Sequence, residues 1–250
     1  MKFSTKIVAI LAAVGLTGGL SVNDVAAIDA RAVTKTCPAI GALPAHPDYG
    51  SGCLDTLWKT RAHGQYGKLT GPDVLLVGDS ITTLCKGYFT SRVQSAGLTW
   101  GVSYWSSRPT QAAVDWVLSL SVKPLVLVMA LGTNDIYDPP RMAAQIARLK
   151  AGLPNTDIRW VDVRAARPAS ATADLRNSRW VNSQIWAAAG ISGVKWIGWF
   201  DEQPNRAKTY IDAKGVHPTD PAGCNFWGAT TAPTVIGAAK AAKLKASVPR

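Results

Sequence analysis

Short, almost purely apolar runs alternate along most of the chain with stretches in which apolar residues recur at helical spacing. The strongest runs are DVLLVG at 73–78 and KPLVLVMALG at 123–132. Runs of this length and composition predict strands of a parallel sheet that is covered on both faces. Residues 98–105, 157–165 and 194–200 predict three further strands, which gives a mostly parallel sheet of about five strands.

Helical spacing occupies the stretches between these runs. Residues 141–153, 174–190 and 232–246 predict helices, the second of which ends at a glycine. Strands that alternate with helices predict βαβ units and an α/β fold with helices on both faces of the sheet. In such a fold, ligands bind at the carboxyl ends of the strands.

The amino-terminal region reads as an export signal followed by an irregular segment. Lys2 and Lys6 precede an apolar stretch at 7–20, and small residues follow at 25–27. A single-pass anchor is the alternative, but three glycines interrupt the stretch and it is short for a bilayer span. We therefore expect a signal peptide at 1–27, an irregular segment packed on the domain at 28–71, and the main domain at 72–250. The mature protein is expected to be secreted.

Four cysteines fit an exported protein, in which disulfides persist. Cys37, Cys53, Cys85 and Cys224 lack the paired C-x-x-C spacing of a zinc site, so we expect no metal. Three pairings are open. Cys37 with Cys53 would close a short loop, which would leave Cys85 and Cys224 to pair with each other.

The formal net charge of +11 bears on the partners of the protein. A basic exported chain is attracted to anionic surfaces such as cell-wall polymers or acidic membranes. The basic residues carry no aromatic-basic signature of a nucleic-acid fold, so no nucleic acid is expected.

Three polar residues follow strands of the predicted sheet. Ser80 comes after the first strand and begins a helix, Asn134 comes after the third, and His217 follows the fifth. Each has an ordinary structural alternative: a helix N-cap for Ser80, a turn for Asn134, and a structural role for the histidine. Together, however, they supply a nucleophile, an oxyanion donor and a base at one edge of the sheet.

The segments GDSIT, GTND and GVHPT that carry these residues resemble blocks one, three and five of the SGNH (GDSL) hydrolase family. The resemblance runs from about residue 72 to residue 220. It implies a flavodoxin-like three-layer α/β/α fold and ester hydrolysis through a serine acyl-enzyme. It also implies that Ser80 is the nucleophile, His217 the base, and that Ser80, Ser107 and Asn134 form the oxyanion hole.

Two positions depart from the family pattern. Ser107 stands where the family has a glycine that donates its backbone N–H, and Lys214 stands where it has an aspartate three residues before the histidine. A lysine cannot accept the imidazole N–H. Asp212 is the first replacement to consider, a Ser-His dyad oriented by a backbone carbonyl is the second, and Asp220 is a third.

These residues predict a secreted serine esterase that hydrolyses small acyl esters of a polysaccharide or a lipid, as a monomer and without a cofactor. Two alternatives use the same residues. One is a catalytically weak or inactive protein that binds cell-wall or acylated glycans, which Lys214 and Ser107 favour. The other is an acyltransferase, which differs from a hydrolase only in the acceptor.

Overall fold

The computed structural model describes residues 63–137, 141–197 and 204–247 of the 250-residue chain. The expected signal peptide, most of the segment 28–71, and Cys37 with Cys53 lie outside the described residues. A six-stranded sheet forms the centre of the described part, in the order β1-β3-β2-β4-β5-β6. The strands are β1 (His63–Gly67), β2 (Val74–Gly78), β3 (Trp100–Trp105), β4 (Val126–Ala130), β5 (Asp157–Val161) and β6 (Ile191–Val194).

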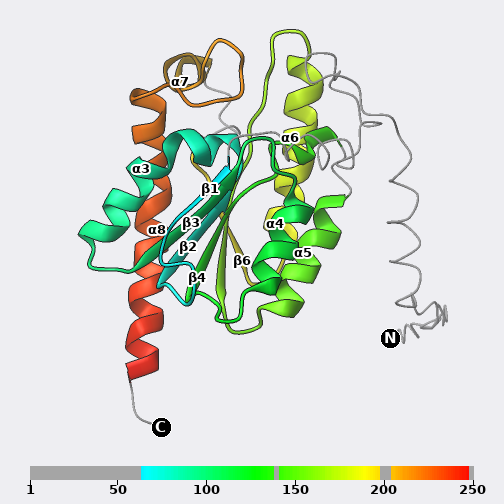
Figure 1. The fold of residues 1–250 in the computed structure, drawn as a ribbon. Coiled ribbons are helices and arrows are strands. Elements are labelled where there is room, and N and C mark those ends of the chain that lie inside the picture. The colour runs from blue at the N-terminus through cyan, green and yellow to red at the C-terminus, as the bar shows by residue number, and fades with distance from the viewer. Residues whose placement is uncertain (1–62, 138–140, 198–203, 248–250) are drawn as a thin grey trace, which may run out of the picture. The chain divides into compact units, whose positions relative to one another are not determined.

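Helices cover both faces of the sheet, which makes a three-layer α/β/α fold (Figure 1). One face packs against α3 (Ser80–Ser95) and α8 (Ala222–Ser247). The other packs against α4 (Thr110–Ser119), α5 (Arg141–Gly152) and α6 (Ala171–Ala187). A 3₁₀ turn, η3 (Asp135–Tyr137), follows β4, and the short helix α7 (Pro204–Tyr210) contacts α8.

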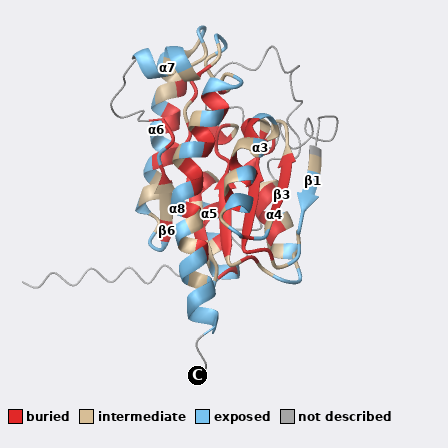
Figure 2. Ribbon diagram, turned by 90° about the vertical axis from the view of Figure 1, so that its left-hand side faces the viewer, coloured by how far each residue is buried: buried red, intermediate tan, exposed pale blue. Residues whose placement is uncertain are grey.

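Burial on both faces explains why the central strands are apolar without interruption. In β2, Val74 and Leu76 contact the core under α3 and α8, whereas Leu75 and Val77 contact the core under α4 and α5. All four side chains are fully buried. Figure 2 shows the same contrast across the molecule, with a buried sheet and helices whose outer faces are exposed.

The strand order places the ends of three strands together. Strand β2 pairs in parallel with β3 on one side and with β4 on the other, and Gly78 at its carboxyl end lies opposite Tyr104 and Ala130. The chain therefore reverses its direction of travel across the sheet at β2, which is the position where open α/β sheets form a ligand crevice.

The sheet has one strand more than the sequence predicted. Strand β1 lies within the segment that we expected to be irregular, and it pairs antiparallel with β3 at the edge of the sheet. Its sequence, HGQYG, carries no apolar run, because an edge strand has little surface to bury. Tyr66 in this strand is half exposed.

The observed bounds of one strand and one helix differ from the predicted bounds. Strand β6 is 191–194, residues 195–197 of the predicted strand 194–200 are not a strand, and its residues 198–200 lie outside the described part. The final helix begins at 222, ten residues before its apolar spacing becomes regular. Helices α4 and α7 lie in stretches where the sequence predicted no helix. No helix within the described ranges has both the length and the apolarity that a membrane span requires.

Candidate active site

Ser80 is presented by a sharp turn from β2 into α3. Gly78 is required there, because a Cβ at this position would lie 1.8 Å from Thr82 Oγ1. Asp79 then caps the helix: its carboxylate accepts the backbone N–H of Ile81 at 2.9 Å. The cap is therefore Asp79 and not Ser80, so the Ser80 hydroxyl is available for other contacts.

His217 supplies that contact. Its Nε2 lies 2.9 Å from Ser80 Oγ, although the two residues are 137 positions apart in the sequence. His217 lies in the loop between α7 and α8, and its side chain is 36% exposed. A serine hydroxyl in hydrogen-bond contact with a solvent-accessible imidazole is the arrangement of a base-activated nucleophile.

A carboxylate lies on the other side of the imidazole ring. Asp212 Oδ2 is 3.7 Å from His217 Nδ1. Asp212 comes close because Ile211 and Pro218 form an antiparallel bridge, so that residues 212 and 217 face each other across a tight turn. The Asp212 N–H donates to the His217 carbonyl at 2.7 Å, and Asp212 Oδ1 accepts the N–H groups of Val216 and His217.

Asp220, the other candidate acid, and Lys214, which stands at the family's acid position, do not contact the imidazole. Lys214 is exposed at the tip of this turn, where the N–H of Gly215 donates to the Asp212 carbonyl. Asp220 accepts a hydrogen bond from the Tyr88 hydroxyl at 2.7 Å, which ties the loop to α3. Among these carboxylates, Asp212 is therefore the one that the turn brings to His217.

The segments that carry the predicted oxyanion donors also meet at this end of the sheet. Ser107 has φ +64°, the left-handed conformation that glycine adopts most readily. Asn134 Nδ2 donates to the Arg108 carbonyl at 3.2 Å and to Asp79 Oδ2 at 3.3 Å, so it bridges the residues next to Ser107 and Ser80. In the described part of the chain, the backbone N–H groups of Ser80 and Ser107 donate to no other group.

Two buried charges beneath the site were not singled out in the sequence analysis. Burial raises the pKa of Asp79 to about 7, and the neighbouring carboxylate of Asp135 acts in the same direction. Burial lowers the pKa of Arg108 to about 9, and its guanidinium lies 4.0 Å from the Trp105 ring centre. The only signal in the sequence was position: Asp79 precedes the serine, and Arg108 follows Ser107.

A disulfide joins Cys85 of α3 to Cys224 of α8, which is one of the three pairings that the sequence left open. It links the helix that begins with Ser80 to the helix that follows the His217 loop. Phe89 and Trp227 extend the same contact, with ring centres 6.0 Å apart. The two elements that carry the Ser-His pair are therefore joined covalently and by packing.

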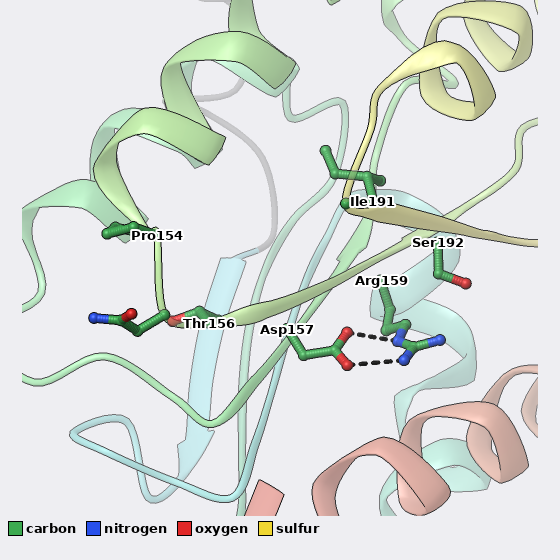
Figure 3. Close-up of a pocket in the computed structure, with 8 residues that line it drawn as sticks. Pro154, Thr156, Asp157, Arg159, Ile191 and Ser192 are labelled. Atoms are coloured by element: carbon green, nitrogen blue, oxygen red, sulfur yellow. Dashed lines mark hydrogen bonds and ion pairs between the residues drawn. The ribbon is translucent and has the colours of Figure 1, made fainter.

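A broad hollow on the molecule lies away from this centre. Its lining residues are at the amino ends of β5 and β6, and its Arg159 is held by Asp157 through two contacts of 2.6 and 2.8 Å (Figure 3). Because it lies at the opposite ends of the strands from Ser80, it does not form part of the site. No cluster of three metal-ligating side chains occurs in the described ranges.

Comparisons with known proteins place the fold. No family model matches the sequence, and no curated protein matches it. Among solved structures, the catalytic domain of peptidoglycan O-acetyltransferase A from Streptococcus pneumoniae is similar, with 17% identity, a TM-score of 0.51, and coverage of 69% of this chain and 95% of that chain.

Two further structures are similar to the same extent. A lipolytic protein of the G-D-S-L family from Veillonella parvula has 17% identity and a TM-score of 0.52 over 63% of this chain and 94% of that one. A family 3 carbohydrate esterase from Talaromyces cellulolyticus has 19% identity and a TM-score of 0.50 over 67% and 98%. At these identities the likeness concerns the fold, which is that of the SGNH (GDSL) hydrolases.

Proposed function

We propose that this protein is a serine ester hydrolase of the SGNH type that removes small acyl groups from a carbohydrate or lipid ester. The observation that carries the proposal is the 2.9 Å contact between Ser80 Oγ and His217 Nε2, with Asp212 on the far side of the ring. The fold shared with solved esterases and with an acetyltransferase supports it.

The proposed reaction begins with proton transfer from Ser80 to His217. The Ser80 oxygen attacks the acyl carbonyl as His217 Nε2 takes the proton, and the resulting imidazolium returns it to the departing alcohol. Asp212 stabilises the imidazolium and holds Nδ1 as the protonated nitrogen. Water, activated by the same imidazole, then hydrolyses the acyl-enzyme and regenerates Ser80.

Negative charge develops on the carbonyl oxygen during each step. We assign its stabilisation to the free backbone N–H groups of Ser80 and Ser107 and to the Asn134 side chain. The Asn134 contacts are long for hydrogen bonds, at 3.2 and 3.3 Å. An anionic oxygen is a stronger acceptor than the Arg108 carbonyl, so Asn134 would donate to it in the transition state.

Secretion is part of the proposal. The signal-like residues 1–27 and the basic charge support a protein that works outside the cytoplasm near anionic surfaces.

The first experiment is hydrolysis of p-nitrophenyl acetate, butyrate and longer esters by the mature protein and by Ser80→Ala. We expect activity on the short esters and a loss of at least about a thousandfold in Ser80→Ala. Ser91→Ala, which changes an exposed serine of the same helix, serves as the matched control and should keep full activity.

The remaining outcomes separate the two alternatives. An inert native protein would contradict the hydrolase proposal and favour a glycan-binding role. Acyl transfer to an added sugar in preference to water, detected by mass spectrometry of the products, would identify an acyltransferase that uses the same residues.

A further inference from the structure

A cavity of about 390 Å³ lies beside Asp212, on the loop that carries the imidazole. Its walls come from the segment after β5, from α7, and from residues 211–215. Neither Ser80 nor His217 lines it. Small residues, among them Ala166, Ala207 and Gly215, leave the space open.

Arg164 is the most distinctive residue of this cavity. It is half-buried, and burial lowers the pKa of its guanidinium. Within the described part of the chain its side chain has no hydrogen bond and no ion pair. By contrast, Arg159 is paired with Asp157 and Arg167 with Asp174.

The charges around the cavity favour an anion. Lys208 of α7 adds a second cation to its lining, and among the described residues that line it Asp212 is the one carboxylate. That carboxylate is already engaged, because Oδ1 accepts two backbone N–H groups and Oδ2 faces His217. Lys214, exposed on the same turn, adds further positive charge.

The half-buried guanidinium of Arg164 donates to no described group of the protein, so a bound oxyanion would accept its hydrogen bonds without breaking an existing contact. Carboxylates and phosphates match the planar fork of arginine and accept two parallel hydrogen bonds from it. The cavity therefore combines space, a free fork donor and net positive charge.

We propose that this cavity is a subsite for a carboxylate or phosphate group carried by the alcohol part of the ester substrate. The inference deepens the proposed function and rests on it for the identity of the reaction. His217 returns a proton to the departing alcohol, and Asp212 borders both His217 and the cavity. The cavity lies on the Asp212 side of the imidazole, so a group on that alcohol that extends past the ring would reach Arg164.

The test compares charged and neutral esters in matched variants. The substrates are O-acetylated galacturonate oligosaccharides, O-acetylated neutral mannan oligosaccharides and a short-chain acyl glycerophosphate. For Arg164→Gln we expect KM to rise about tenfold or more on a charged substrate with kcat unchanged, and no change on the neutral one. Lys245→Gln, which removes a distant exposed charge of α8, controls for net charge.

The two charged substrates distinguish the sources of the oxyanion. A KM effect confined to the galacturonate ester identifies an acidic sugar chain, and one confined to the glycerophosphate ester identifies a phosphate headgroup. The subsite would be overturned if Arg164→Gln raised KM equally on charged and neutral substrates. It would also be overturned if the variant left KM unchanged on both charged substrates.

A binding measurement keeps this test independent of catalysis. Ser80→Ala should bind unesterified galacturonate oligosaccharides or glycerophosphate in calorimetry, and the double variant with Arg164→Gln should not. If these probes bind but the native protein hydrolyses no ester, the proposed function is contradicted and the subsite is not. Absence of binding to both probes would contradict the subsite.

Thermal unfolding should show that Arg164→Gln is as stable as the native protein, because the lost side chain has no partner.

Discussion

At the residue scale, the central question is what orients His217. Lys214 stands at the position where the family pattern has the orienting aspartate, but the turn places Asp212 beside the ring and leaves Lys214 exposed to solvent. The separation of 3.7 Å between Asp212 Oδ2 and His217 Nδ1 is longer than a hydrogen bond. It needs to shorten by under an ångström when the ring becomes charged, and such tightening is common once substrate binds.

Asp212→Asn tests this assignment. The amide oxygen can still accept the N–H groups of Val216 and His217, so the loop should keep its shape, but it cannot stabilise an imidazolium. We expect kcat for p-nitrophenyl acetate to fall by about 10² to 10⁴, with KM little changed. Asp220→Asn is the matched control and should lose no more than a few-fold. Full activity of Asp212→Asn would instead identify a Ser-His dyad.

Asp79 makes a second prediction at this scale, because burial raises its pKa from 3.8 to about 7. Between about pH 4 and pH 7 the folded protein keeps a proton that the unfolded chain has lost, so Asp79 lowers the stability as the pH rises through this window. Asp79→Asn does not titrate. The free energy of unfolding of Asp79→Asn, minus that of the native protein, should therefore rise by about 2 kcal/mol from pH 5 to pH 8. Chemical denaturation at both pH values measures this, and a constant difference would contradict it.

At the scale of elements, the site depends on how strands end. Gly78 permits the close approach of Thr82 in the turn into α3, and Ser107 adopts a left-handed backbone before α4 begins. Both features arise where the chain leaves the sheet and enters a helix. Side-chain chemistry matters less there than backbone conformation, which is why a serine can stand where the family has glycine.

Substitution of Ser107 tests that view. Ser107→Gly should stabilise the protein by about 0.5–1 kcal/mol and keep kcat, because glycine tolerates positive φ and its N–H remains. Ser107→Val should lower both the stability and kcat, since a β-branched residue is strained in this conformation. Loss of activity in Ser107→Gly would mean that the hydroxyl itself takes part.

At the scale of the whole molecule, α3 and α8 hold the two halves of the site together. The Cys85–Cys224 disulfide closes a stretch of 139 residues, so it restricts the unfolded chain strongly. Replacing both cysteines by alanine should lower the free energy of unfolding by about 2–5 kcal/mol. The control is the native protein with its disulfide reduced, which should show a similar loss. An unchanged melting temperature in the double variant would contradict a stabilising role.

The sequence by itself determined the α/β fold, the central strands, and the three blocks that carry Ser80, Asn134 and His217. It could do so because strands buried on both faces must be apolar, and because the blocks of Ser80 and Asn134 lie where β2 and β4 end. It also indicated the Cys85–Cys224 pair, as one of three open pairings.

Only the tertiary structure decided which carboxylate meets the imidazole. Asp212 approaches through a turn closed by backbone contacts, and Lys214 points away at its tip; neither follows from spacing alone. The tertiary structure also decided the place of β1, an edge strand without an apolar pattern. It decided as well that Arg164 has no hydrogen-bond partner among the described residues, because that depends on which side chains of other segments lie near it. These features arise from contacts between distant segments, which local periodicity does not record.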